Sequence, residues 1–142
     1  MNDKFLKPYN PIETEGRIYK LWEESGFFNP DNLPKRHIEP FTIIMPPTNA
    51  NGSLHAGHAL VITIEDIITR YMRMRGKRTL WLPGLDHAGF ETQVVFEKVL
   101  EKQGRSRFDM DRDTLYKEIL QFTLNNSKNI KTQIRSMGAS CD

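Results

Sequence analysis

The strongest structural signal in this chain is the stretch of residues 44–60, IMPPTNANGSLHAGHAL. It starts as a short apolar strand, passes a Pro-Pro pair and an Asn-Gly turn, and enters an amphipathic helix that opens with two histidines around a glycine. A helix N-terminus presents unpaired backbone N–H groups and about half a positive charge, so it attracts anions. His55 and His58 add side-chain donors at the same place. The stretch therefore predicts a phosphate-binding site.

The residues on either side predict a βαβ unit. Residues 41–45 are mostly β-branched or aromatic and stop at a Pro-Pro pair, as in a buried strand. A helix over about 56–75 ends at Gly76, and residues 79–82 form a second strand. Strand, helix and strand within some forty residues imply parallel pairing with a right-handed crossover. One face of the helix is apolar and carries Leu60, Ile64, Ile67, Ile68, Tyr71 and Met72.

Ligands of parallel sheets bind beyond the carboxyl ends of the strands. Both informative loops, 46–58 and 83–90, follow strands and lie at that edge. Asp86, after the second strand, could meet an ammonium group held after the first, a contact worth about 1.5–3 kcal/mol. The alternative for Asp86 is a turn or N-cap role before the next helix.

Helices are also predicted before and after this unit in the sequence. The first is expected from Pro11 to Ser25, with Asn10 as N-cap, Glu13 completing a capping box, and Gly26 as the stop. Apolar periodicity predicts two more helices, over 91–102 and 112–137.

The predicted fold class is α/β, a parallel βαβ unit with an N-terminal helix and C-terminal helices. We divide the chain into an N-terminal helical extension, 1–40, and the first part of a nucleotide-binding domain, 41–142. Because two parallel strands cannot bury helices on both faces, we expect an N-terminal piece of something longer.

Composition narrows the class of protein. The 142 residues carry a formal charge of only +2, too small to indicate nucleic acid binding by itself. A single cysteine, Cys141, suits a reducing compartment, and no multi-cysteine zinc site is expected. The start, residues 1–4, has no leader character, and no apolar run reaches the roughly 20 residues of a membrane span. We expect a cytoplasmic protein with no membrane contact.

Two groups of side chains have more than one interpretation. His55 and His58 could join His87 in a three-histidine metal site, or His55 could serve only as a helix cap, but the zinc-helix pattern of His at i and i+4 with an interposed Glu is absent. We therefore expect no metal ligands. A basic cluster near the C-terminal end of the helix predicted over 56–75 favours dipole compensation and solubility over contact with the phosphates of a nucleic acid. The cluster comprises Arg70, Arg73, Arg75, Lys77 and Arg78.

Residues 46–59, PPTNANGSLHAGHA, resemble the first signature of the class I aminoacyl-tRNA synthetases, which ends in His-x-Gly-His. Residues 81–93, WLPGLDHAGFETQ, are similar to the valyl branch of that family. Residues 8–22 and the Gly-x-Ser-x-Asp of 138–142 are also similar to it. The resemblance covers nearly the entire chain and implies the first half of a Rossmann-like synthetase catalytic domain.

The resemblance also implies roles for individual residues. His55 and His58 would be catalytic and contact the phosphates of ATP, and Asp86 would bind the ammonium of the amino acid. The implied ATP-binding residues are Asn51, Gly52, His55, Gly57 and His58, and the implied amino-acid-binding residues are Pro46, Pro47, Asn49 and Asp86.

The activity implied by the resemblance is that of a valine–tRNA ligase. The substrates would be ATP with Mg²⁺, valine and tRNA(Val), without a tightly bound cofactor, and we expect a monomer. These residues contain no lysine-rich second signature, so we expect them to be inactive alone. Three different functions stay open beside this one. They are an isoleucyl-type synthetase, suggested by Ala50-Asn51, a stand-alone nucleotidyltransferase, and a non-catalytic nucleotide- or RNA-binding module.

Overall fold

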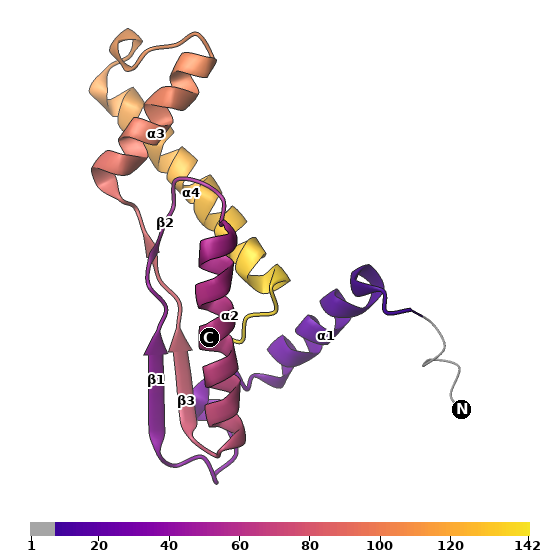
Figure 1. Ribbon diagram of the computed structural model, residues 1–142. Coiled ribbons are helices and arrows are strands. Elements are labelled where there is room, and N and C mark those ends of the chain that lie inside the picture. Colours follow the sequence, from indigo (N-terminus) through magenta and orange to yellow (C-terminus); the bar gives the residue numbers. More distant parts are fainter. Residues whose placement is uncertain (1–7) are drawn as a thin grey trace.

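The computed structural model describes residues 8–142, so the expectation about residues 1–4 lies outside it. Figure 1 shows a small sheet with one long helix beside it, a helical hairpin beyond one end, and a first helix that projects away. The elements are α1 (Pro11–Ser25), η2 (Pro30–Asn32), β1 (Pro40–Ile44), β2 (Thr48–Asn49), α2 (Ala56–Met74), β3 (Arg78–Leu82), β4 (Leu85–Asp86), α3 (Gly89–Lys102), η3 (Arg107–Asp109) and α4 (Arg112–Ser136).

The predicted parallel βαβ unit is confirmed. Strands β1 and β3 pair in parallel from Pro40 opposite Arg78 to Ile44 opposite Leu82, and α2 connects them. A second parallel pair, β2 with β4, was not predicted, because two residues are too few to show a periodicity. This second pair extends both chains past the Pro-Pro segment, so the two loops run side by side.

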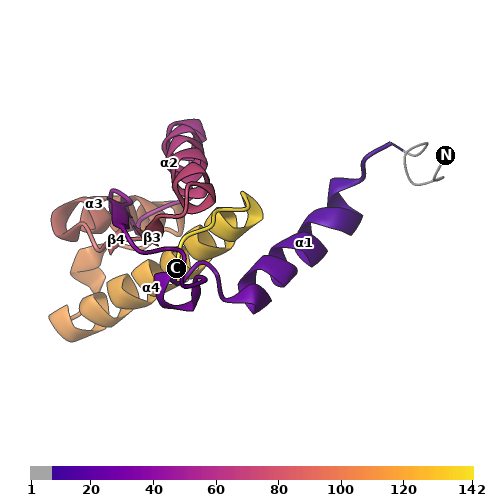
Figure 2. The same ribbon diagram turned by 90° about the horizontal axis from the view of Figure 1, so that it is seen from below.

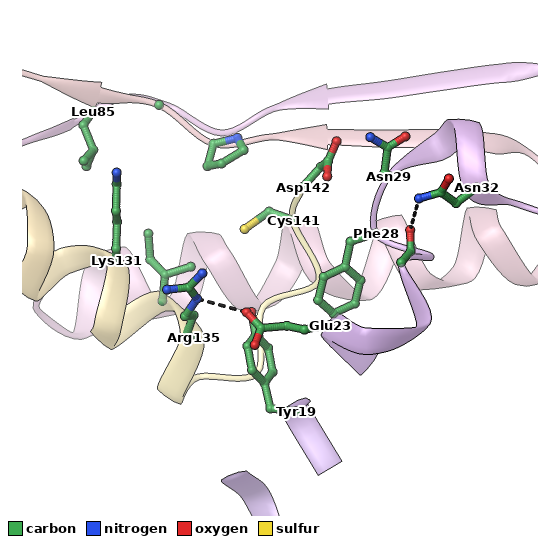
Figure 3. Close-up of a pocket in the computed structure, with 14 residues that line it drawn as sticks. Tyr19, Glu23, Phe28, Asn29, Asn32, Leu85, Lys131, Arg135, Cys141 and Asp142 are labelled. Atoms are coloured by element: carbon green, nitrogen blue, oxygen red, sulfur yellow. Dashed lines mark hydrogen bonds and ion pairs between the residues drawn. The ribbon is translucent and has the colours of Figure 1, made fainter. Parts of the chain in front are cut away.

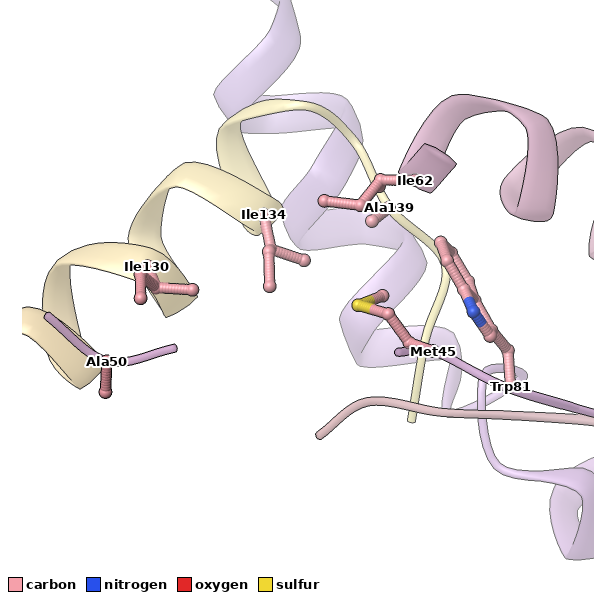
Figure 4. Close-up of a cluster of buried hydrophobic side chains, with 7 residues drawn as sticks. All are labelled: Met45, Ala50, Ile62, Trp81, Ile130, Ile134 and Ala139. Atoms are coloured by element: carbon pink, nitrogen blue, oxygen red, sulfur yellow. The ribbon is translucent and has the colours of Figure 1, made fainter. Parts of the chain in front are cut away.

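The core lies between the strands, α2 and the end of α4 (Figure 4). Trp81 is completely buried, and its indole N–H donates to Glu65 of α2 at 3.0 Å. The prediction of a buried first strand was wrong, because β1 alternates between exposed and half-buried residues. A helix covers only one face of this two-stranded sheet. The core residues are Met45, Ala50, Ile62, Trp81, Ile130, Ile134 and Ala139.

The side of α2 that packs against the protein is not the apolar face read from the sequence. Ile62 and Thr69 are its buried residues, whereas Leu60 is 63% and Ile67 is 62% exposed. The packed side combines Ile62 of the core with polar side chains, and Glu65, Asp66, Arg70 and Arg73 among these form hydrogen bonds with other segments. The exposed side is an apolar stripe that also includes Ile64, Ile68 and Tyr71.

The segment after α4 returns to α2 and is fixed there by charged side chains. Asp66 accepts hydrogen bonds from the Ser140 N–H at 2.9 Å and the Ser140 hydroxyl at 2.6 Å. Arg70 donates to the Gly138 carbonyl at 2.7 Å and lies over the Trp22 ring, while Arg73 donates to the Ser140 carbonyl at 2.8 Å. We call these contacts the α2–C-terminal latch.

The latch changes the interpretation of the basic cluster. Burial lowers the pKa of Arg73, although Asp66 opposes this, and both Arg70 and Arg73 are partly buried. Their function in this fold is to hold the C-terminal segment, so solubility explains only the exposed members, such as Arg75.

Helix α1 follows its sequence signals. Asn10 caps it by accepting from the Ile12 N–H at 3.1 Å, and Gly26 ends it in the left-handed conformation. The bond from Glu13 that would complete a capping box is not found, so that part of the prediction was wrong. The helix has no buried residue and extends outward in both views (Figure 2). Its Tyr19 hydroxyl donates to the Ala139 carbonyl at 3.0 Å.

Within residues 8–142, every helix is too short or too polar to cross a bilayer.

The latch predicts a selective loss of stability. Arg73→Met should lower the free energy of unfolding by about 2–3 kcal/mol, because it removes hydrogen bonds from a charged donor to partly buried acceptors. Arg75→Met, on the exposed side, should change it by less than about 0.5 kcal/mol. Urea denaturation followed by tryptophan fluorescence measures both, and equal effects of the two variants would contradict the latch.

Candidate functional site

The two signature histidines lie together at the start of α2. Their ring centroids are 3.8 Å apart and the ring planes are tilted by 35°. His55 is the N-cap, and its Nδ1 accepts from the Gly57 N–H at 3.1 Å. The His55 N–H donates to His58 Nδ1 at 3.2 Å, which completes a reciprocal capping box. The structure therefore confirms that His55 caps the helix.

These bonds fix the tautomer of each neutral ring. A backbone N–H can donate only to an unprotonated ring nitrogen, so both Nδ1 atoms are acceptors and the ring proton sits on Nε2. Each histidine thus keeps an Nε2–H donor that the cap does not use. One helix start therefore supplies two adjacent ring donors with a defined orientation.

Burial, and then the neighbouring His55 ring, lowers the pKa of His58. The ring is therefore neutral near pH 7, as its acceptor role at Nδ1 requires. The attraction for an anion then comes from N–H dipoles and the helix terminus rather than from a full charge on His58.

The glycines of the signature differ in what they do. A Cβ on Gly57 would lie 2.9 Å from His55 Cε1, so the ring occupies the space that a side chain would need. A Cβ on Gly52 would meet nothing within 4 Å. Asn51 and Gly52 lie in the turn between β2 and α2, as expected, beside open space.

The second strand end meets the first as predicted. Asn49 of β2 and Asp86 of β4 are paired residues in parallel strands, so their side chains lie on the same face. One oxygen of Asp86 accepts from the Ala88 N–H at 2.8 Å and supports Ala88 at a φ of 51°. The turn role weighed for Asp86 is thus real, and the second carboxylate oxygen has no hydrogen-bond partner among the described residues.

Sequence reasoning missed Glu91 in the first turn of α3. It accepts a 2.6 Å hydrogen bond from the Asn49 amide, so it orients a side chain expected to border the amino acid. Its only signal in the sequence was an acidic residue near a helix start. Pro46 and Pro47 are exposed, and Pro47 lies against Gly84, where a Cβ would be 3.3 Å from the Pro47 Cβ. The two loops therefore touch at the strand ends.

A cavity of about 800 Å³ opens between α1, α4 and the end of β3 (Figure 3). Arg135 and Lys131 line one side of it, and Glu23 and Asp142 contribute opposite charge. Arg135 donates to Glu23 at 3.1 Å, so part of this charge is already paired. The signature histidines do not line this cavity.

The remaining histidines do not join the pair. His87 is exposed, and both ring nitrogens of the buried His37 bond to carbonyl oxygens of Pro34 and Arg73. Within residues 8–142, no three His, Cys, Asp or Glu side chains are placed to hold a metal ion. The described residues therefore do not assemble the three-histidine site weighed from the sequence.

The fold and the site together define an α/β unit with a parallel strand pair, a His-x-Gly-His helix start and a carboxylate after its second strand. Residues 17–142 match the family model of the class I tRNA synthetases for isoleucine, leucine, methionine and valine. The chain therefore belongs to the class I tRNA synthetases.

Its relatives include proteins named valine–tRNA ligase. The chain is 47% identical over 134 residues to the one from Carboxydothermus hydrogenoformans, covering 94% of this chain and 15% of the relative. It is 48% identical over 131 residues, 92% of this chain and 13% of the relative, to a chloroplastic/mitochondrial form from Arabidopsis thaliana. The chain thus spans about 15% of the length of such relatives.

Gly57→Ala tests whether the missing side chain serves the histidine. The new Cβ should displace the His55 ring, and loss of the cap bond and the gain in helix propensity, each about 1 kcal/mol, should offset one another. We expect shifted ring ¹H–¹³C NMR signals of His55 with little change in unfolding free energy. Gly52→Ala is the matched control and should leave these signals in place, and unshifted signals in Gly57→Ala would contradict the prediction.

The lowered pKa of His58 predicts a pH-dependent stability. The unfolded ring titrates near 6.5 and the folded ring lower, so the unfolded state binds more protons between the two values. The contribution of His58 to the free energy of unfolding is fully present above pH 6.5 and decreases as the pH falls below that value. Wild type should therefore lose more stability between pH 7 and 5 than His58→Gln. If the free energy of unfolding of the two proteins changed with pH in parallel, His58 would make no such contribution.

Proposed function

We propose that the protein containing these residues is a valine–tRNA ligase. What carries this proposal is the paired Nε2–H donors of His55 and His58 at a helix start, in a chain whose relatives bear that name. ATP, accompanied by Mg²⁺, valine and tRNA(Val) would be its substrates. We further propose that it acts in the cytoplasm as a monomer, while its relatives include organellar forms.

In the proposed reaction, a valine carboxylate oxygen forms a bond to the α-phosphorus of ATP. The bond from that phosphorus to the bridging oxygen breaks, and pyrophosphate leaves with the electron pair. His55 and His58 would donate to phosphate oxygens as negative charge develops there. Because both rings are already oriented by the cap, little reorganisation is needed when the reaction occurs.

The amino acid would lie across the two strand ends. The unpartnered oxygen of Asp86 would accept from the ammonium, and Asn49, held by Glu91, would border the side-chain pocket together with Pro46 and Pro47. The in-register pairing of Asn49 with Asp86 supports this arrangement, because it places both side chains on one face. Asn51, Gly52 and Gly57 would lie along the nucleotide.

The proposal predicts the result of ATP–pyrophosphate exchange by the full-length protein with valine, isoleucine, leucine and methionine. Exchange should be fastest with valine, and His55→Ala or His58→Ala should each lower kcat by about 100- to 1000-fold, the usual cost of one preorganised donor. Fastest exchange with isoleucine would assign an isoleucyl-type synthetase instead.

Aminoacylation distinguishes a ligase from a stand-alone nucleotidyltransferase and from a non-catalytic module. A valine–tRNA ligase transfers labelled valine to tRNA, whereas a stand-alone nucleotidyltransferase would turn over without transferring it. A non-catalytic RNA-binding module would show neither activity, and its RNA affinity would fall in Arg75→Ala but not in His55→Ala. Arg70 and Arg73 are unsuitable for this comparison, because their loss would also open the latch.

A further inference from the structure

Helix α4 contacts the loop that leads into the histidine pair. The Gln133 side-chain oxygen accepts from the backbone N–H of Leu54 at 2.9 Å, although the two residues are 79 positions apart. One helical turn earlier, the Asn129 amide donates to the Ser53 hydroxyl at 3.1 Å. Positions i and i+4 of a helix lie on one face, so this face of α4 holds two consecutive residues of the loop.

Apolar packing makes this contact rigid. Ile130 lies between the two polar positions and is completely buried, as is Ala50 at the start of the loop, and Leu54 packs against the same core. Figure 4 shows Ile130 and Ala50, which belong to the same buried cluster. Because cores are close-packed, the burial of Ile130 fixes the backbone of α4, and this fixes the position of the Gln133 side chain.

The same helix is also fixed to the far end of α2. The α2–C-terminal latch joins Gly138 and Ser140, just after α4, to Asp66 and Arg70 in the second half of α2. Helix α4 therefore contacts the loop before α2, and the segment directly after α4 contacts the C-terminal half of α2. Its position relative to the start of α2 is set at two separate places.

We propose that Gln133 is a positioning residue for the histidine pair, a role that rests on the proposed function. Leu54 immediately precedes His55, and the His55 N–H is itself the donor to His58 Nδ1. The hydrogen bond from Leu54 to Gln133 fixes the peptide plane next to this donor. Without it the loop can rotate, and both Nε2–H groups move from the place where phosphate oxygens would lie.

The test uses the full-length protein, with ATP–pyrophosphate exchange at saturating MgATP. Gln133→Met keeps the length of the side chain but removes the oxygen acceptor, and Gln133→Glu keeps an acceptor. Gln121→Met is the matched control, since Gln121 lies on the same helix, is exposed and has a side chain that donates to Asn125 of that helix. Thermal unfolding is measured for each variant.

We expect Gln133→Met to lower kcat by about tenfold or more, because a displacement near 1 Å can cost about 100-fold. The KM for valine should stay within twofold, since the proposed amino-acid-binding residues lie at the strand ends and not at the Leu54 amide that Gln133 holds. Gln133→Glu should restore most of kcat, and Gln121→Met should behave as wild type. A Gln133→Met enzyme with wild-type kcat would overturn the proposal, as would a Gln133→Glu enzyme as impaired as Gln133→Met.

Hydrogen exchange of the unmodified protein provides a second measurement if Gln133→Met fails to fold. The Leu54 amide should exchange slowly, and rapid exchange at this amide would overturn the proposal. This measurement does not depend on the catalytic activity of the protein. If wild type fails to exchange pyrophosphate with valine while the Leu54 amide is protected, the proposed function fails and the contact itself stands.

Discussion

The parallel pairing of β1 with β3 is the constraint on which the rest of this structure depends. Parallel strands end at the same edge, so the pairing brings the Pro-Pro loop and the loop after Trp81 together. The short β2–β4 pair continues that alignment and sets Asn49 beside Asp86. The crossover helix α2 follows β2 in the chain, so its capping histidines lie at the end of the first of these loops. Fold and candidate site are therefore one geometric arrangement.

Around this unit, polar contacts join neighbouring elements in addition to the apolar core. The inward side of α2 holds the C-terminal segment through Asp66, Arg70 and Arg73, and α4 holds the loop before α2 through Gln133. The apolar stripe of α2 is left exposed.

Much of this could be predicted from the sequence, because the signals were local. The α2 bounds, the parallel unit and the position of Asp86 follow from periodicity, caps and strand-end rules. The orientation of α2 could not be predicted, since hydrophobic periodicity does not reveal that Asp66 and Arg73 have partners near residue 140. Gln133 was missed for the same reason. A glutamine on an amphipathic helix has no local feature that indicates an acceptor for a distant backbone amide.

The central claim is that the backbone of the α2 start orients both histidines as Nε2–H donors before any ligand arrives. Long-range ¹H–¹⁵N NMR at pH 7.5 reads the tautomer of each ring directly, because protonated and unprotonated ring nitrogens differ in ¹⁵N shift. The account predicts that Nδ1 is unprotonated and Nε2 protonated in both His55 and His58. A protonated Nδ1 in either neutral ring would contradict the reciprocal cap and, with it, the phosphate site that we propose.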